Sequence, residues 1–169
     1  HWPRSLGPPL ATGELRTQPD DIRVDELPQV KPSGEGDHLW VQVTKCGANT
    51  DWIAGQLALA AGCAARDVGY AGLKDRYAVT TQWFSIPMAA TKEPPWQEWQ
   101  IAEATIIQAV RHQKKLKRGV LTGNRFRIVV RNIQGDAGEL SQRLEQVRLR
   151  GLPNYFGPQR FGHAGDNAW

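Results

Sequence analysis

The sequence predicts an α/β protein of the α+β type, in which a mixed, mainly antiparallel sheet packs against helices. Several segments alternate apolar and polar residues with the period of two that is typical of half-buried strands. Two longer segments have the apolar spacing of helices and end at a glycine. With 169 residues, 40% of them hydrophobic, the chain is long enough for one domain with a sizeable core.

The first half of the chain is predicted to hold four strands and one helix. Residues up to Pro19 are rich in proline and glycine and are expected to wrap the surface. The helix is expected to begin near Asn49, bury Ile53 and Leu57, and end at Gly62. Alternation and β-forming residues place the strands at residues 22–27, 38–44, 67–72 and 80–86.

The second half is less regular until its last helix. Residues 92–99 suit a loop or a short helix, and residues 101–112 suit either a strand or a helix. After a break at residues 119–123, a strand is predicted whose one face is apolar and whose other face is largely basic. An amphipathic helix is expected from Asp136 to Arg150, with three inward residues: Leu140, Leu144 and Val147.

Composition favours a cytoplasmic protein. No apolar run is long enough to span a membrane, and the first four residues do not form a secretory signal. Cys46 and Cys63 lack the spacing of zinc ligands or of a disulfide framework, so both are expected to be ordinary buried thiols. A small-molecule enzyme is disfavoured because no phosphate-binding glycine loop and no Ser/His/Asp set is recognisable. We expect a monomer without a metal.

The charge is distributed unevenly along the chain. The formal net charge is +4, yet no Asp or Glu occurs from Ala104 to Gly135. Such a one-sided block indicates a polyanionic partner, and a solvated cationic face explains it equally well. The block contains Arg111, Lys114, Lys115, Lys117, Arg118, Arg125, Arg127 and Arg131.

The segment from Val68 to Arg76 carries the candidate chemistry. Glycines and small residues allow close backbone approach, and they end at Asp75, held between Lys74 and Arg76. A carboxylate has an ordinary pKa of about 3.9, and burial raises it unless a cation offsets the desolvation. The sequence therefore allows a nucleophilic carboxylate at this corner. The alternative is a solvated turn without a catalytic role.

Residues 152–162 combine three aromatic side chains with amides and Arg160 in a glycine-punctuated loop. Aromatic rings beside amides and cations suit RNA binding through base stacking and phosphate contact. Alternatively, some of these rings anchor the loop in the core. The final residues resemble the start of another helix, as though the chain were cut.

Three motifs in order make the sequence similar to the TruD-type pseudouridine synthases that act on transfer RNA. Residues 72–82 resemble the family pattern G-x-K-D-x-x-A-x-T-x-Q. Residues 123–126 and 153–162 are similar to two further family segments, the second being PNYFGxQRFG. The resemblance extends from about Gly13 onward.

This resemblance implies a catalytic role for Asp75. In that family the aspartate attacks the target nucleoside, and the uracil detaches, rotates and rejoins its ribose through carbon; attack on the base and attack on the sugar both remain open. The implied substrate is the uridine at position thirteen in the D arm of transfer RNA. No metal and no organic cofactor is implied. Asn124 and Phe126 fall on positions that contact this uridine, with the ring stacking on the flipped base; a core role for Phe126 is the alternative.

Three further residues are expected at the substrate by the same resemblance. Arg16 replaces a family lysine and is expected to keep Asp75 ionised, although arginine and lysine differ in geometry. Ile22 replaces a phenylalanine and offers an apolar contact without a ring. Lys74 is expected to contact substrate.

The resemblance also implies a longer protein and leaves a second hypothesis. Family members have a second half and an inserted domain to which nothing here corresponds, so residues 1–169 are expected to be the N-terminal portion of the catalytic domain. The expected RNA contacts are Arg111, Lys114, Lys115, Arg125, Arg127 and Arg160. The second hypothesis is a non-catalytic RNA-binding module or an inactive fragment.

Overall fold

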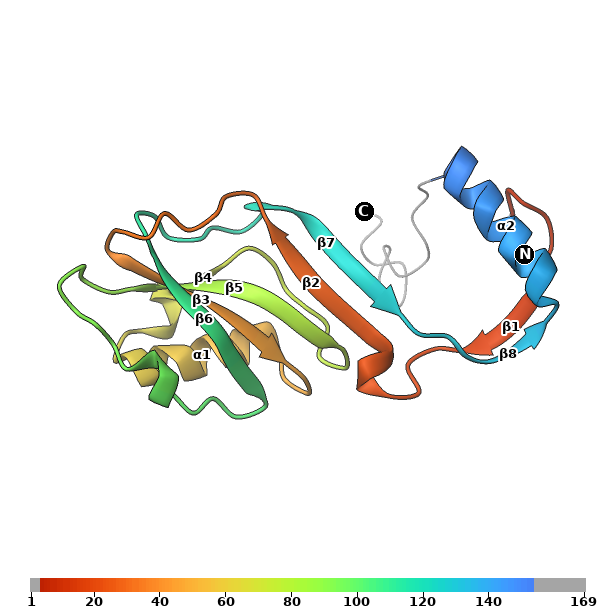
Figure 1. Ribbon diagram of the computed structural model, residues 1–169. Coiled ribbons are helices and arrows are strands. Elements are labelled where there is room, and N and C mark those ends of the chain that lie inside the picture. The colour runs from red at the N-terminus through yellow and green to blue at the C-terminus, as the bar shows by residue number, and fades with distance from the viewer. Residues whose placement is uncertain (1–3, 154–169) are drawn as a thin grey trace, which may run out of the picture. The chain divides into compact units, whose positions relative to one another are not determined.

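The structure is a computed structural model that describes residues 4–153 (Figure 1). The chain divides into two compact units. One unit is Glu14–Arg131, and the described part of the other consists of residues 4–13 and 132–153. The first unit contains the main sheet and all the described residues expected at the site. Each unit is considered separately below.

The main unit is built on a six-stranded sheet, and it confirms the predicted mixed, mainly antiparallel arrangement. Five strands follow the order β6-β3-β5-β2-β7, and β4 pairs with β5. Only the β2–β5 pairing is parallel among the pairs of this sheet. The strands are β2 (Ile22–Pro28), β3 (His38–Lys45), β4 (Gly69–Tyr70), β5 (Val79–Pro87), β6 (Ala104–His112) and β7 (Leu121–Ile128).

Helix α1 (Thr50–Ala61) covers one face of the sheet over β3, β5 and β6. It follows Asn49 in extended conformation and ends at Gly62, whose φ of 69° suits a residue without a side chain. Ile53 and Leu57 are fully buried against the sheet. The strand residues on this face include Leu39, Val41, Val43, Phe84 and Ile86, so the alternation of β3 is confirmed.

The opposite face of the sheet carries a second, smaller cluster. Trp40 and Trp83 lie 6.2 Å apart between ring centroids and pack with Ala71 and Leu116. The indole Nε1 of Trp40 donates to the carbonyl of Lys114 at 2.9 Å. This bond fixes part of the basic loop between β6 and β7 against the sheet.

Tertiary pairing decides the segments that the sequence left open. Residues 104–112 form β6 because they pair with β3 along its length. A short 3-10 helix, η3 (Trp96–Glu98), lies within the loop expected at residues 92–99. The strand expected at residues 67–72 is shorter, since only Gly69 and Tyr70 pair with β5 and η2 (Ala65–Asp67) precedes them. Strand β7 begins at Leu121, inside the predicted break.

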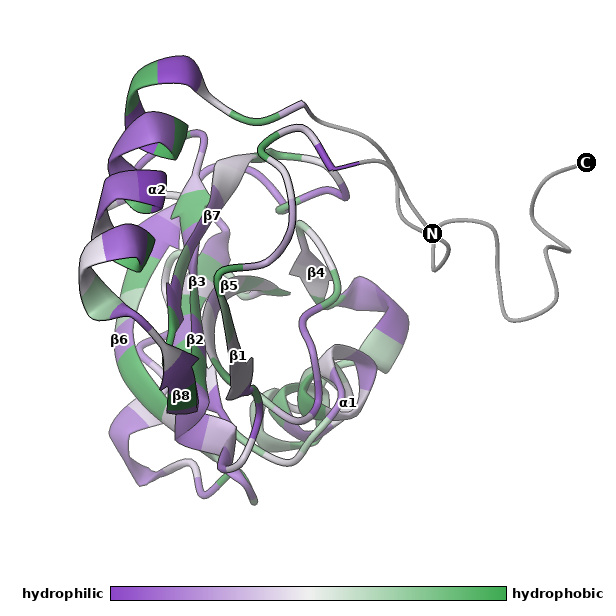
Figure 2. Cartoon of the chain, turned by 90° about the vertical axis from the view of Figure 1, so that its right-hand side faces the viewer, coloured by the Kyte–Doolittle hydropathy of each residue, from purple (hydrophilic) through white to green (hydrophobic). Residues whose placement is uncertain are grey.

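The second unit contains a two-stranded sheet and a helix. Strands β1 (Ala11–Glu14) and β8 (Arg131–Gly135) pair, although neither was predicted, and their end residues Glu14 and Arg131 belong to the main unit. Helix α2 (Ala137–Arg150) confirms the predicted helix; the Asp136 carboxylate accepts a bond from the Glu139 amide at 2.8 Å. The expected inward position of Leu144 is wrong, because its exposure is 59% and no described layer covers it. In Figure 2 α2 is mostly hydrophilic.

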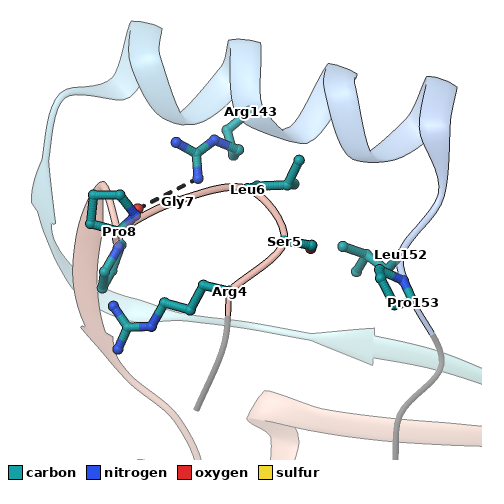
Figure 3. Close-up of a pocket in the computed structure, with 9 residues that line it drawn as sticks. Arg4, Ser5, Leu6, Gly7, Pro8, Arg143, Leu152 and Pro153 are labelled. Atoms are coloured by element: carbon teal, nitrogen blue, oxygen red, sulfur yellow. Dashed lines mark hydrogen bonds between the residues drawn. The ribbon is translucent and has the colours of Figure 1, made fainter. Parts of the chain in front are cut away.

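A cavity of about 650 Å³ lies within this second unit (Figure 3). Its wall is the N-terminal loop on one side and α2 with the residues after it on the other. Arg143 donates to the carbonyl of Pro8 at 3.5 Å across it. The lining residues are Arg4, Ser5, Leu6, Gly7, Pro8, Pro9, Arg143, Leu152 and Pro153.

Both cysteines are free thiols, and each is half-buried rather than fully buried as expected. Burial raises the pKa of the Cys63 thiol above its ordinary value. Within residues 4–153, neither helix is long and apolar enough to cross a bilayer. The same residues contain no cluster of three or more His, Cys, Asp or Glu side chains placed to hold a metal ion.

Candidate active site

Asp75 lies in the loop between β4 and β5, with its carboxylate partly open to solvent. Its side chain is 36% exposed. One carboxylate oxygen, Oδ2, is 3.1 Å from the Arg16 guanidinium, and the other accepts a bond from the Tyr77 amide at 3.0 Å. The carboxylate is therefore held in one orientation and is still accessible to an incoming group.

Arg16 reaches Asp75 from the segment that precedes β2. Its backbone has a φ of 60°, in the left-handed region that residues with a side chain rarely adopt. The side chain itself is 60% exposed. The expected pairing of this cation with Asp75 is thus present, in a loop with an unusual backbone conformation.

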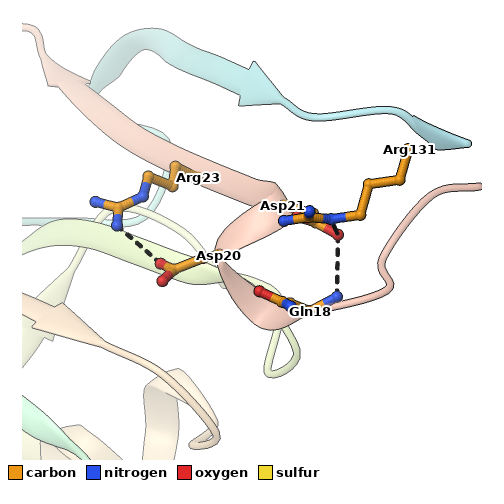
Figure 4. A network of polar contacts seen from close by, with 5 residues as sticks. All are labelled: Gln18, Asp20, Asp21, Arg23 and Arg131. Carbon is orange, nitrogen blue, oxygen red and sulfur yellow. Dashed lines mark hydrogen bonds and ion pairs between the residues drawn. The ribbon is translucent and has the colours of Figure 1, made fainter.

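The short 3-10 helix η1 (Pro19–Asp21), directly before β2, holds the Arg16 segment in place through Asp21 (Figure 4). Asp21 is fully buried, and Arg131 donates to both of its oxygens at 2.7 to 3.0 Å. The Gln18 amide donates to the same carboxylate at 3.0 Å. The bonds from Arg131 hold the pKa of Asp21 below its ordinary value. Asp21 thereby fixes the segment between Arg16 and β2.

Lys74 turns away from solvent and forms a buried ion pair with Glu26 of β2. Its ammonium is 2.7 Å from Oε2 of Glu26, and the two side chains are only 5% and 1% exposed. The other oxygen of Glu26 accepts a bond from the Trp83 amide at 3.2 Å. In this arrangement Lys74 ties the Asp75 loop to the sheet. Its expected contact with substrate remains a prediction.

Two further residues of the 72–82 motif are bonded to one another inside the protein. Gln82 donates to the carbonyl of Gly72 at 3.1 Å and accepts a bond from the Thr50 hydroxyl at 3.0 Å. That hydroxyl also accepts a bond from the Lys74 amide at 3.0 Å. Thr50 and Gln82 are both buried. The spacing of the motif is therefore explained by a network that fixes the loop before Asp75.

Strand β7 presents Asn124 and Phe126 on the same face as the Lys74–Glu26 pair. Directly opposed residues of antiparallel strands share a face, and Asn124 opposes Glu26 while Phe126 opposes Val24. Phe126 is 61% exposed, so its alternative role in the core is not the one the structure shows. Ile22, opposite Ile128, lies on this face too. An aspartate, a cation and an exposed ring thus border one face of the sheet.

The basic residues do not form one surface. Arg125 and Arg127 oppose Asp25 and Arg23, on the face away from Phe126. Arg111 belongs to β6, at the other edge of the sheet, where it donates to the carbonyls of Met88 and Lys92. The basic residues that form one block in the sequence are therefore divided between the two edges of the sheet.

The loop between β6 and β7 carries four cations of the block: Lys114, Lys115, Lys117 and Arg118. Lys114 is exposed, and Lys115 donates to the carbonyl of Arg66 at 2.9 Å. The Arg118 guanidinium lies 4.1 Å from the centre of the Tyr70 ring and pairs with Asp51 at 3.7 Å. Arg160 and the aromatic segment after Pro153 lie outside the described residues.

Sequence analysis missed Glu26 and Lys45 as functional candidates, although their position in the strands was informative. Glu26 has the same parity as Ile22 and Val24, and Lys45 has the same parity as Val41 and Val43. Both charged residues therefore lie on an inward face, where a charge needs a partner. Alternation alone identifies their position, and the partner comes from distant parts of the chain.

A partly exposed carboxylate fixed in a loop, and an exposed aromatic ring on the same face of the sheet, together make this face the candidate site. Comparison with known proteins then gives the family. Residues 7–167 match the family described as tRNA pseudouridine synthase D (TruD). The chain belongs to the TruD family.

Curated relatives and a solved structure agree with this assignment. The chain is 47% identical to tRNA pseudouridine synthase D of Methylococcus capsulatus over 98% of its own length and 47% of the relative's length. It is 49% identical to the Nitrosococcus oceani protein of that name, over 95% and 45% of the two lengths. A crystal structure of a Methanosarcina mazei protein, provisionally named tRNA pseudouridine synthase D, aligns with a TM-score of 0.77 and 31% identity, over 89% of this chain and 35% of that chain. This chain spans about half the length of the curated relatives it matches.

Proposed function

We propose that the protein containing this chain is a tRNA pseudouridine synthase that uses Asp75 as its nucleophile. In this proposal residues 1–169 form the N-terminal portion of the catalytic domain, and the target is the uridine at position thirteen in the D arm. The observation that supports it most directly is the Asp75 carboxylate, oriented by Arg16 and the Tyr77 amide and still open to solvent.

The proposed reaction is an isomerisation, so atoms balance without a second substrate. Asp75 attacks the nucleoside, the bond between uracil nitrogen and ribose breaks, the base rotates, and a bond from ribose to a uracil carbon forms. The uracil carbon gives up the proton that the ring nitrogen regains, and the carboxylate is released. The Tyr77 amide and Arg16 keep the two oxygens oriented, which favours attack from one fixed position.

Recognition of the base is assigned to β7. A uridine in a folded RNA reaches a carboxylate only after leaving its stack. The exposed ring of Phe126 provides a stacking surface, and the amide of Asn124, on the same face, can bond to the polar edge of uracil. Ile22 adds apolar surface at the end of this face.

RNA backbone contacts are proposed for the basic residues, in two groups. Lys114 and Lys115 belong to the loop between β6 and β7, near Arg111 at the end of β6, whereas Arg125 and Arg127 lie on the opposite face of β7 from Phe126. One RNA is proposed to contact both groups. A transfer RNA is large and curved enough to contact several faces of a small domain.

Replacement of Asp75 by asparagine in the complete protein tests this function. Pseudouridine formation in a tRNA transcript under single-turnover conditions is expected to fall by about 10³-fold or more, as happens when a covalent nucleophile is removed. The matched control is Asp25→Asn, an exposed aspartate on the other face of β2. A near wild-type rate for Asp75→Asn refutes the nucleophile. Tight tRNA binding by the wild type with no conversion supports the binding-module hypothesis instead.

A further inference from the structure

Lys45, at the end of β3, is a buried charge to which the proposed reaction so far assigns no role. The residue is 1% exposed. Its ammonium donates to two main-chain carbonyls, that of Ala48 at 2.8 Å and that of Asp75 at 2.9 Å. Among the described residues no carboxylate oxygen lies within ion-pair distance of it. The second carbonyl is the main-chain carbonyl of Asp75, the residue whose side chain is the proposed nucleophile.

Burying the ammonium of Lys45 carries a desolvation cost for folding, which its bonds to two main-chain carbonyls offset in part. Removing an ammonium from water is costly unless a counter-charge or good acceptors replace its hydration. Burial accordingly lowers the pKa of Lys45, while the negative charge of Asp75 acts in the opposite direction. An apolar side chain of similar length would occupy the same space without this penalty.

The two carbonyls belong to segments that meet directly behind Asp75. Ala48 is in the turn that leads from β3 into α1. In the same place the Gly47 amide donates to the Arg76 carbonyl at 3.0 Å, and the Arg76 side chain donates back to the Gly47 carbonyl at 2.8 Å. Lys45 thus completes a set of bonds that joins the turn before α1 to Asp75 and Arg76.

We propose that Lys45 is a positioning residue for Asp75: its buried ammonium fixes the main chain of the nucleophile and places a positive charge behind it. The inference rests on the proposed catalytic role of Asp75. Orientation of a reacting group to within a fraction of an ångström strongly affects rate, so a small displacement of this main chain is sufficient to slow the reaction. The bond from Lys45 acts on the loop and makes no contact with the base.

The test compares Lys45→Met and Lys45→Gln with the exposed control Lys31→Met in the complete protein. We expect Lys45→Met to lower the single-turnover rate by about 10²-fold, the loss expected from a misplaced reacting group, with tRNA Kd within about twofold of wild type. Its melting temperature should not fall, because the desolvation cost of the buried ammonium is removed together with its two bonds. Lys45→Gln, which still donates a bond without a charge, should be intermediate, and it replaces the methionine variant if that variant does not fold.

A pH profile adds a readout that a purely structural role would not affect. The groups facing Lys45 are Asp75, Cys46 and Lys74. The wild-type rate should decline as pH rises and Lys45 loses its proton. Because burial lowers the pKa of Lys45, this decline should begin below the ordinary lysine value of 10.5, and Lys45→Met should lack it. A wild-type rate in Lys45→Met, or a loss of rate matched by an equal loss of tRNA affinity, overturns the inference. An active Asp75→Asn variant would refute the proposed nucleophile, whereas an inactive Asp75→Asn beside a fully active Lys45→Met would refute only the role of Lys45.

Discussion

The two sides of the candidate site are constructed differently. On the Asp75 side, the loop is bonded to buried groups on three elements: Lys45 of β3, Thr50 of α1 and Glu26 of β2. On the β7 side, Asn124 and Phe126 belong to an edge strand and are exposed. The proposed nucleophile is therefore fixed by the fold, whereas the proposed recognition surface is open to solvent. Breaking the buried Lys74–Glu26 pair on the first side should lower stability, whereas variants on the second side should weaken tRNA recognition and leave stability nearly unchanged.

The largest effect is expected from Glu26→Ala. This change leaves the Lys74 ammonium buried without its partner, and breaking a buried pair in this way destabilises proteins by about 3–5 kcal/mol. Urea unfolding of the complete protein measures the loss. The control is Asp20→Ala, which breaks an exposed pair with Arg23 and should cost about 0–1 kcal/mol. Equal losses of stability in the two variants would show that the buried Lys74–Glu26 pair does not hold the Asp75 loop.

Phe126→Ala should produce the opposite pattern. Because the ring is largely exposed, the free energy of unfolding should change by less than about 0.5 kcal/mol. Loss of a stacked base costs about 1–3 kcal/mol, so kcat/KM for a tRNA transcript should fall by roughly 5- to 150-fold. Phe126→Tyr keeps the stacking surface and should stay close to wild type. If Phe126→Ala unfolds the protein and Phe126→Tyr is as slow as the alanine variant, the ring is structural.

A third, smaller effect concerns the basic loop between β6 and β7. Leu116 is buried, and its amide donates to the Ser85 hydroxyl at 2.8 Å, while the Gly119 amide donates to the Ala71 carbonyl at 2.8 Å. The loop is thus held rigidly while Lys114 and Lys117 stay exposed. Replacing both lysines by glutamine should reduce the slope of log affinity against log salt by about 1.4–1.8, if each neutralises one phosphate.

Titration of tRNA binding between low and moderate salt measures that slope. The matched double variant is Arg125→Gln with Arg127→Gln, on the face of β7 away from Phe126. A reduced slope for one pair alone identifies that pair as the one that contacts the RNA. An unchanged slope for both pairs would remove them from the RNA surface.

The alternation of apolar and polar residues predicted most strands, but the side chains that surround Asp75 are brought together by contacts between distant parts of the chain. Alternation is readable in β2, which has one buried face, and in β3 although Trp40 is buried on its other face, and it also marks Glu26 and Lys45 as inward charges. Their partners are unreadable locally: Lys74 is 48 residues from Glu26, and Asp75 is 30 residues from Lys45. The buried pair of Lys74 with Glu26 could not be read from the sequence for the same reason, and the substrate contact that the resemblance implies for Lys74 stays a prediction. Strands β1 and β8 went unnoticed because they are short and largely exposed, without an apolar alternation.

The smallest effect under ordinary conditions concerns Asp21, which anchors the segment carrying Arg16 and should respond only to acid. Its pKa in the folded protein is lowered chiefly by the bonds from Arg131, relative to an ordinary value of 3.8. The unfolded chain therefore binds this proton more readily than the folded protein. The stability contributed by Asp21 is fully present above pH 3.8 and is lost as pH falls through the lower, folded pKa.

Thermal unfolding across this pH range, for the wild type and Arg131→Gln, checks the sign. Because Arg131→Gln removes the bonds that lower the pKa of Asp21, its stability should decline less steeply with acid, from a lower starting value. Other carboxylates titrate in the same range, and the difference between the two curves isolates the Asp21–Arg131 pair. Parallel curves would mean that this pair is not what holds the Arg16 segment, and the fixed side of the site would then depend on Lys45, Glu26 and Thr50 alone.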